Sequence, residues 1–189
     1  FEDMGVLFID VDEDGDLDLF VASGGVECVP GSSLLLDRVY LNDGLGNFTK
    51  GHSSLMPDIR TSSSVVAAAD IDLDGTQEIF IGGRVVPGKY PLSPNSFIIK
   101  KIDSNYSDAT TKLAPEIKNA GMVTSAIFSD VDIDGWPDLL VTYEWGPVRF
   151  FHNDSGFLYD RTADVDMAER LGWFNSISGG DIDNDGDID

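Results

Sequence analysis

Short apolar segments recur along the chain in pairs, and an acidic loop that contains glycine separates the members of each pair. The segments are short, rich in β-branched and aromatic residues, and flanked by turn-forming residues, which is typical of β-strands. Further apolar segments after each pair predict a third and a fourth strand. The predicted strands lie at residues 6–9, 19–21, 39–41 and around 48, at 65–69, 79–81, 97–99 and around 106, and at 126–128, 139–141, 148–151 and 157–159. We therefore expect units of four antiparallel strands.

The units repeat at a nearly constant spacing. Their acidic loops begin at Asp10, Asp70, Asp130 and Asp181, which gives spacings of 60, 60 and 51 residues. A four-stranded repeat of this length fits a β-propeller better than a solenoid, whose repeats are usually shorter, and a sandwich would show no such repeat. Small residues just before the loops, such as those at 67–69, suit an innermost strand crowded near a central axis.

The predicted fold class is all-β: a partial β-propeller of about three four-stranded antiparallel blades plus the start of a fourth. We expect residues 1–189 to be a fragment of one propeller domain, with repeats at approximately 1–60, 61–120, 121–173 and 174–189. Because propellers typically need four to eight blades, the remainder of the ring is expected to lie outside this chain, both of whose ends look cut from something longer.

The negative charge of the chain is concentrated in the acidic loops. The formal net charge is -22, and 19 of the 34 acidic residues lie in the four loops, so the rest of the chain is close to balanced. No basic patch is available to neutralise phosphates, which excludes a nucleic-acid partner. The single cysteine, Cys28, excludes an internal disulfide framework and a cysteine zinc site. No run of 18 apolar residues predicts a membrane-spanning segment.

Each acidic loop follows the pattern Asp-x-Asp-x-Asp-Gly-x-x-Asp/Glu. Carboxylates at positions 1, 3, 5 and 9 and a carbonyl at position 7 supply the hard oxygen ligands that calcium prefers, and glycine at position 6 allows the sharp turn. We therefore predict up to four Ca²⁺ sites, the fourth cut off directly after its last ligand. The predicted ligands are Asp10, Asp12, Asp14, Asp16 and Asp18 in loop 1, Asp70, Asp72, Asp74, Thr76 and Glu78 in loop 2, Asp130, Asp132, Asp134, Trp136 and Asp138 in loop 3, and Asp181, Asp183, Asp185, Asp187 and Asp189 in loop 4.

Other interpretations of the loops fit less well. An EF-hand places a glutamate at position 12 between helices, whereas that position is Val21, Ile81 or Val141, inside predicted strands. Glycine-rich nonapeptide calcium rolls would repeat every nine residues. Metal-free Asp-Gly hairpins are the remaining alternative, but crowded carboxylates repel one another unless a cation neutralises them. Loops 2 and 3 carry Thr-Gln and Trp-Pro at positions 7 and 8, and we expect them to bind calcium more weakly or differently.

These loops, together with the segments Val-Tyr-Leu-Asn-Asp-Gly at 39–44, Gly-Gly-Arg-Val-Val-Pro-Gly-Lys-Tyr-Pro at 82–91 and Gly-Trp-Phe-Asn-Ser at 172–176, resemble the FG-GAP/VCBS repeats of the integrin α-subunit propeller and of cartilage acidic protein and ASPIC/UnbV-type proteins. The likeness is strongest to large secreted VCBS-repeat proteins of Bacteroidetes. The resemblance implies a seven- or eight-bladed propeller, calcium in the hairpins between first and second strands, and a location that is extracellular or on the cell surface, associated with the bacterial outer membrane if the bacterial likeness holds. It implies no known reaction.

Strand alternation predicts that a ligand face lies opposite the calcium loops. The connections at 24–37 and 82–96 are long, and long loops on a rigid scaffold commonly carry function. They place on one face the predicted ligand-binding residues Arg84, Lys89, Tyr90, Trp145 and Trp173. For each aromatic residue, packing between blades is the competing interpretation. We expect Arg84 to bind an anionic partner, such as a uronic-acid glycan or a protein carboxylate.

The leading functional prediction is an extracellular calcium-binding module that mediates binding or adhesion to a protein or glycan, with calcium in a structural role. The alternative is a calcium-dependent polysaccharide lyase or hydrolase on a propeller scaffold. We assign no catalytic residue, because His52 and His152 lie in different repeats without a matched nucleophile and the most obvious carboxylates are already committed as loop ligands. We expect His152 to be a surface residue near the calcium loops. Assembly of subunits through open blade edges is a third possibility.

Overall fold

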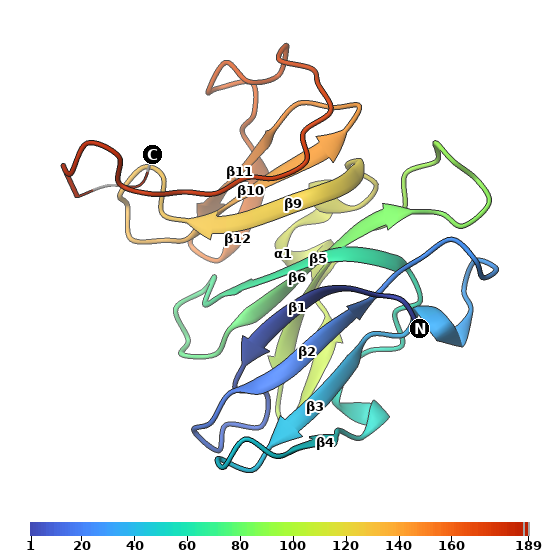
Figure 1. The fold of residues 1–189 in the computed structure, drawn as a ribbon. Helices are drawn as coiled ribbons and strands as arrows, with labels where there is room; N and C mark the ends of the chain where they lie inside the picture. The colour runs from blue at the N-terminus through green and yellow to red at the C-terminus, as the bar shows by residue number, and fades with distance from the viewer. Residues whose placement is uncertain (187, 189) are drawn as a thin grey trace.

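Within residues 1–186 and residue 188, which the computed structural model describes, the protein folds into three four-stranded antiparallel sheets that follow one another along the chain (Figure 1). Each sheet keeps its strands in chain order and forms one blade. Blade 1 contains β1 (Asp3–Ile9), β2 (Asp18–Ser23), β3 (Arg38–Asn42) and β4 (Phe48–Lys50); blade 2 contains β5 (Ser62–Ala69), β6 (Glu78–Val85), β7 (Phe97–Ile102) and β8 (Asn105–Asp108); blade 3 contains β9 (Met122–Ser129), β10 (Asp138–Glu144), β11 (Arg149–Asp154) and β12 (Phe157–Asp160).

The predicted all-β class and the predicted blades are therefore confirmed. Helical structure in the described residues is limited to short turns, namely α1 (Thr110–Leu113) and the 3₁₀ turns Ser33–Leu35, Ser53–Leu55 and Pro115–Ile117. The described residues after β12 form no strand beyond an isolated bridge between Gly146 and Gly172, although the fourth acidic loop adopts the same turn as the others. None of the helices in the described part of the chain has the length and apolar composition needed to span a bilayer.

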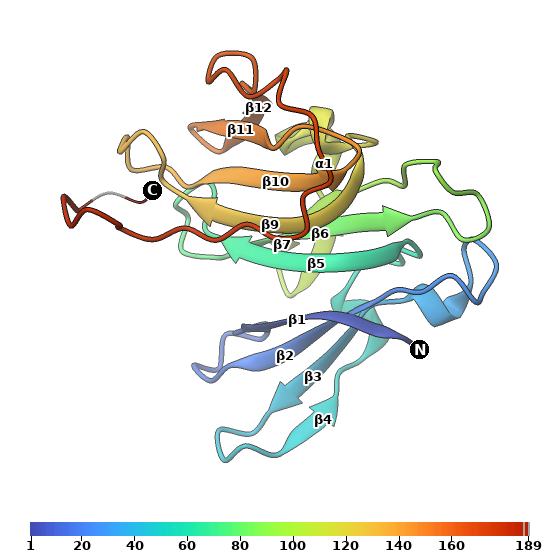
Figure 2. The same cartoon turned by 45° about the horizontal axis from the view of Figure 1, so that its top comes forward.

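The first strands of the three blades, β1, β5 and β9, lie beside one another as inner strands (Figure 2). Each inner strand has a bulge six residues before its loop, where the pairing register skips Met4, Ser64 or Thr124. At this bulge the Ser64 hydroxyl donates to the carbonyl of Val123 on β9 at 2.9 Å. A small residue is needed here, because a Cβ added to Gly5 would lie 2.9 Å from the carbonyl oxygen of Ser64. The inner strands can therefore approach closely enough to pack blade on blade.

The hydrophobic core consists of two layers, one between each pair of neighbouring blades. Side chains alternate across a strand, so a blade in the middle can bury both of its faces. On β6, Ile79 and Ile81 point into the layer shared with blade 1, whereas Phe80 points into the layer shared with blade 3. All three are almost completely buried. On β1, in contrast, Val6 and Phe8 are 62% and 57% exposed on the face of blade 1 that no described blade covers.

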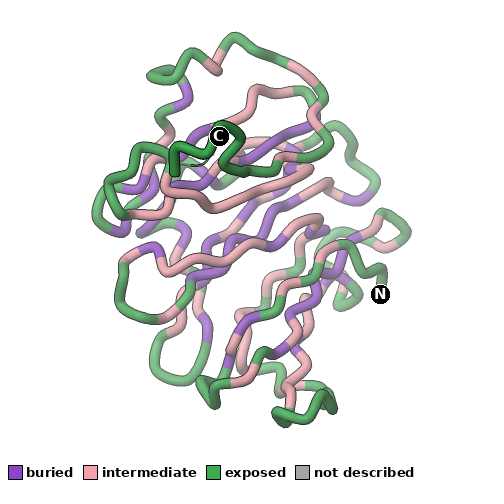
Figure 3. Tube along the Cα trace, turned by 60° about the vertical axis from the view of Figure 1, so that its left-hand side comes forward, coloured by how far each residue is buried: buried purple, intermediate pink, exposed green. Residues whose placement is uncertain are grey.

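The alternating strand directions place the loops on two opposite sides of the molecule. The three acidic loops β1–β2, β5–β6 and β9–β10 emerge together on one side, and the long β2–β3 and β6–β7 connections emerge on the other (Figure 2). Exposed chain is concentrated in these loops, while the strands between them are mostly buried or half-buried (Figure 3). The blades therefore form a rigid support with a distinct acidic side and a distinct long-loop side.

Candidate metal centres and the long-loop face

All four acidic loops form the same local turn, which the aspartate at position 1 holds. Its two carboxylate oxygens accept backbone N–H groups from position 4 or 5 and from the glycine at position 6. That glycine has a φ of 92–100° in every loop, a conformation that side-chain-bearing residues rarely adopt. The bonds are Asp10 with Glu13 (2.7 Å) and Gly15 (3.1 Å), Asp70 with Asp74 (3.0 Å) and Gly75 (2.9 Å), Asp130 with Asp134 (3.1 Å) and Gly135 (2.9 Å), and Asp181 with Asp185 (3.2 Å) and Gly186 (3.1 Å).

The acid at position 9 anchors each of the first three loops to the body of its blade. Asp18, Glu78 and Asp138 begin the second strands and are fully buried. Each accepts the N–H of the residue at position 2 of its own loop, at 2.8, 2.9 and 3.1 Å respectively. Asp18 and Asp138 also accept the N–H of Asn42 and Asn153 on the third strand, at 2.8 and 2.7 Å. These bonds satisfy part of the buried negative charge and connect each loop to its sheet.

The carboxylates of each loop converge on a common point. In every loop one oxygen from each of three acids lies within 4.8 Å of the others. All the donors in these four sets are hard oxygens, which suits Ca²⁺ or Mg²⁺ better than a transition metal. The converging sets are Asp10, Asp12 and Asp18; Asp70, Asp72 and Glu78; Asp130, Asp132 and Asp138; and Asp181, Asp183 and Asp185.

Two further observations in loop 1 are consistent with a bound cation. The Oδ1 atom of Asp16 is buried and has no hydrogen-bond partner among the described residues, so one carboxylate oxygen is left unsatisfied by the protein itself. The pKa of Asp12 is raised, first by partial burial and then by the neighbouring charges of Asp18 and Asp14. Both observations mean that the ionised loop is under-neutralised, and a divalent cation would correct this.

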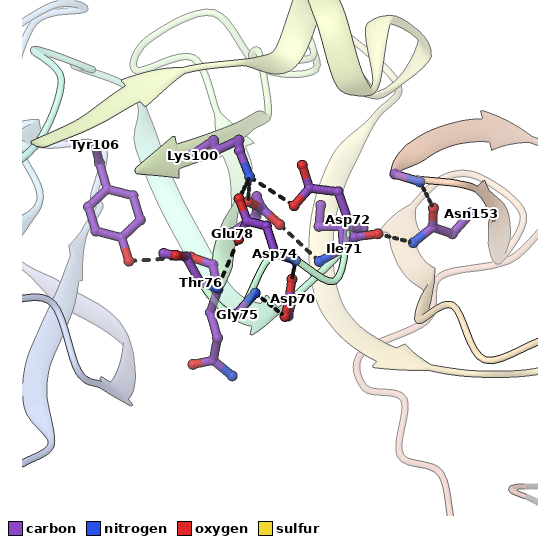
Figure 4. Close-up of polar contacts among 12 residues, drawn as sticks. Asp70, Ile71, Asp72, Asp74, Gly75, Thr76, Glu78, Lys100, Tyr106 and Asn153 are labelled. Atoms are coloured by element: carbon purple, nitrogen blue, oxygen red, sulfur yellow. Dashed lines mark hydrogen bonds and ion pairs between the residues drawn. The ribbon is translucent and has the colours of Figure 1, made fainter. Parts of the chain in front are cut away.

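The three complete loops differ in the residue that the third strand places over them. Strand pairing sets Tyr40, Ile99 and Phe151 opposite equivalent residues of the second strands, so the residues that follow them are also equivalent. These following residues are Leu41 in blade 1, Lys100 in blade 2 and His152 in blade 3. Over loop 2, the Lys100 ammonium contacts three carboxylates (Figure 4).

His152, like Lys100, lies over a loop, and the sequence analysis did not predict this position for either residue. We predicted a surface histidine, but its ring is half-buried, with Nδ1 3.2 Å from Asp138 Oδ1 and 3.4 Å from Asp132 Oδ2. The physical reason is the register of β11, which turns this side chain inward over loop 3. An imidazole nitrogen therefore joins the oxygens of Asp132 and Asp134 in a second possible ligand set for this loop.

Neighbouring blades are joined through the loops. Lys101 of blade 2 donates from Nζ to the carbonyl of Val11, at position 2 of loop 1, at 2.7 Å. Asn153 of blade 3 donates from Nδ2 to the carbonyl of Ile71, at position 2 of loop 2, at 2.9 Å (Figure 4). The two contacts are equivalent by position, so loops 1 and 2 are each held in part by the third strand of the following blade.

The predicted ligands at positions 5 and 7 are hydrogen-bonded to each other in the first three loops. The acids at position 5, Asp14, Asp74 and Asp134, accept the N–H groups of Asp16, Thr76 and Trp136 at position 7, at 3.1, 2.9 and 2.8 Å. Asp187 and Asp189 lie outside the described residues. Whether these residues bind a metal ion stays a prediction.

On the long-loop side, four of the five predicted ligand-binding residues lie together. The hydroxyl of Tyr90 donates to Glu144 Oε1 at 2.7 Å and accepts the indole N–H of Trp145 at 2.8 Å. The ring of Trp145 lies 5.0 Å from that of Trp173, and Arg84 forms an ion pair with Glu144. We call Tyr90, Trp145 and Trp173 the aromatic shelf. Its members are 57%, 64% and 52% exposed, so packing between blades does not bury them.

Two of the predicted residues have surroundings that were not expected. Arg84 is paired with Glu144, whose side chain is only 3% exposed, and its binding of an external anion stays a prediction. The partner was missed because it comes from the equivalent position of the next blade, 60 residues away. Lys89 is exposed in the β6–β7 connection, and no contact found among the described residues joins its side chain to the shelf. A hollow of about 390 Å³ lies next to the shelf, lined in part by Arg84, Tyr90, Glu144 and Trp173.

The protein is built from propeller-type repeats. Four-stranded blades follow one another with their inner strands side by side, and each blade carries an acidic hairpin between its first two strands. Residues 10–81, from loop 1 through loop 2 and into β6, match the family model of the FG-GAP-like repeat. Residues 10–81 therefore support the FG-GAP-type repeat that the sequence resemblance implied, and such repeats are typical of extracellular proteins. A search of curated proteins found no match.

Proposed function

We propose that the chain is an extracellular calcium-binding propeller module that mediates binding or adhesion to a protein or glycan through its long-loop side, with calcium as a structural ion. The convergence of three carboxylates in loop 1 carries the calcium part of this proposal; among the described residues no cationic side chain contacts these three carboxylates, and Lys101 pairs only with Glu13 of the loop. Calcium takes six to eight oxygen ligands at roughly 2.3–2.6 Å, and a bound ion would draw Asp10, Asp12 and Asp14 together. The hairpin is then fixed relative to β1 and β2.

Removal of calcium tests this structural role. An ion present at 100 times its dissociation constant stabilises the folded protein by about 2.7 kcal/mol per site, which is about 5–10 °C in Tm for a chain of this size. We expect excess EDTA to lower the Tm by at least this much, and added calcium to restore it. The matched pair of variants is Asp12→Asn/Asp14→Asn in loop 1 and Asp164→Asn/Asp166→Asn on an exposed turn far from the loops.

The loop 1 variant is expected to lose one bound calcium and part of the Tm shift. The control removes two charges as well but is expected to keep both. An unchanged Tm in EDTA, with the protein verified to be metal-free, would contradict a structural role for calcium. Calcium binding that the loop 1 variant leaves intact would contradict the assignment of the ion to this loop.

The aromatic shelf supports a glycan as the ligand on the opposite side. Exposed apolar rings that gather on one face commonly mark binding sites. Each ring of the shelf combines an apolar face with a polar edge, which suits the apolar face and the hydroxyl groups of a sugar ring. The hydrogen bonds from Trp145 to Tyr90 and from Tyr90 to Glu144 fix the orientation of two of the rings before a ligand binds.

A panel of immobilised glycans, neutral and uronic-acid-containing, probed with the intact protein tests the shelf. We expect Trp145→Ala to weaken binding at least tenfold. Tyr159→Ala removes a comparably exposed aromatic ring from β12, away from the shelf, and is expected to leave binding unchanged. If no glycan binds, or if the two variants behave alike, the shelf is not a glycan site.

A further inference from the structure

Lys100 occupies the point at which the carboxylates of loop 2 converge. Its ammonium nitrogen lies 2.6 Å from Glu78 Oε1, 2.9 Å from Asp72 Oδ1 and 2.8 Å from Asp74 Oδ2 (Figure 4). These three acids stand at positions 3, 5 and 9, which are three of the four carboxylate positions of the loop pattern. An ammonium group has three N–H donors, so it can donate one hydrogen bond to each of the three carboxylates.

The Lys100 ammonium neutralises part of the charge of loop 2, because it donates to three of the carboxylates in this loop. In loop 1 the third strand carries Leu41 at the equivalent position. Within the described part of the chain, Lys101 contacts loop 1 only at Glu13 and at the carbonyl of Val11, outside the converging carboxylates. Among the described residues, loop 2 therefore has a cation between its converging carboxylates, and loop 1 has none.

A calcium ion cannot share this point with the ammonium. Calcium needs oxygens at roughly 2.3–2.6 Å around it, and here three of the available oxygens already surround a positive charge. The side chain of Lys100 is only 18% exposed, so its charge lies within the blade, and a second cation would meet it at short range in a poorly screened environment.

We propose that the Lys100 ammonium is the cation of loop 2, in the place that calcium takes in loop 1, so that loop 2 keeps its turn without a metal ion. This inference rests on the proposed function, in which the other loops take calcium. It assigns the loops different roles: the hairpin of the middle blade is insensitive to calcium, and the hairpin of blade 1 responds to it.

Calcium counts on the intact protein and on matched variants test the proposal. Bound calcium is measured by equilibrium dialysis and elemental analysis at saturating calcium. We expect Asp72→Asn/Asp74→Asn in loop 2 to leave the count of the wild type unchanged. Asp12→Asn/Asp14→Asn in loop 1 lowers it by one. A loss of one calcium from the loop 2 variant overturns the inference. An unchanged count in the loop 1 variant contradicts the proposed function instead, so the two failures are distinguishable.

Removal of the ammonium gives the complementary test. Lys100→Met keeps most of the side-chain stem and leaves Glu78 buried without its cation. We expect this variant to bind one calcium more than the wild type, and its Tm to fall in EDTA and recover with calcium. Lys101→Met removes the neighbouring lysine, which contacts loop 1 rather than the loop 2 carboxylates, and is expected to keep the wild-type count.

The double variant Glu78→Gln/Lys100→Met covers the case in which Lys100→Met does not fold without calcium. It removes the buried charge together with its partner and is expected to fold in EDTA. Recovery of a folded Lys100→Met protein by calcium alone, with one additional ion bound, supports the proposal. A Lys100→Met protein that folds without gaining a calcium site overturns it.

Discussion

Replacing Asn153 by alanine should remove a buried hydrogen bond between blade 3 and loop 2. The side chain of Asn153 is completely buried, and its amide nitrogen donates to the carbonyls of Ile71 at 2.9 Å and Pro137 at 3.0 Å. Its amide oxygen accepts the N–H of Gly156 at 2.8 Å. Asn153→Ala therefore leaves two carbonyls and one N–H group unpaired. Each unpaired buried group costs about 1–3 kcal/mol, and a water molecule that enters the new space recovers part of this. We expect a loss of about 3 kcal/mol.

Asn42 provides the matched control, because it stands at the equivalent position of blade 1. Its side chain donates to the carbonyl of Leu17 at 3.1 Å and accepts the N–H groups of Asp43 and Gly46 at 3.0 and 3.1 Å. All three bonds lie at the exposed turn of a single blade, where water can replace them. We expect Asn42→Ala to cost no more than about 1 kcal/mol.

Urea unfolding at fixed, saturating calcium measures the free energy of unfolding of both variants. The difference between them should be about 2 kcal/mol, because only Asn153 joins two blades at a buried site. Equal losses within about 0.5 kcal/mol would refute the reasoning that the buried contact between blades, rather than the turn itself, determines the effect. A reduced slope of the unfolding transition in Asn153→Ala would show in addition that the blades no longer unfold together.

Two further predictions concern packing and pH. A Cβ on Gly82 would lie 2.7 Å from methyl carbons of both Val65 and Val123, so Gly82→Ala should lower the free energy of unfolding by about 1–3 kcal/mol. A Cβ on Gly180 would have no atom within 4 Å, so Gly180→Ala should change the free energy of unfolding little. Equal effects of the two variants in urea unfolding would contradict the packing argument. Burial raises the pKa of Asp37 to about 7, above its value of about 3.9 in an unfolded chain, so the stability that its protonated form contributes is complete below about pH 4 and is lost as the pH rises through 7. Asp37→Asn should therefore show a smaller fall in Tm than the wild type between pH 5 and pH 8, and parallel pH profiles would count against a raised pKa.

The blades and the acidic turns could be predicted from the sequence because both depend on local pattern. A loop is contained within nine residues, and its turn needs only an aspartate at position 1 and a glycine at position 6 that tolerates a positive φ. The strand segments are short and apolar, and the turns between them are rich in glycine and aspartate. The sequence also predicted that the acidic loops and the long loops lie on opposite sides, since antiparallel strands in chain order can place successive loops only on alternating ends of the blade.

The partners of Arg84 and Asn153, in contrast, come from neighbouring blades. Glu144 lies 60 residues from Arg84, and Ile71 lies 82 residues from Asn153. Nothing in the local pattern distinguishes these residues from other polar positions on strands. Only the packing of one blade on the next, with its buried hydrophobic layer, brings the members of each pair within bonding distance.

The sequence by itself determined that each blade carries an acidic hairpin able to hold a cation, because the ligands and the turn lie in one short segment. The tertiary structure decided which side chain the third strand places over each hairpin. Leu41, Lys100 and His152 follow their loops at unequal spacings, since the connections between second and third strands differ in length, so no repeat in the sequence aligns them. They become equivalent only when the strands pair and the register turns each side chain over its loop.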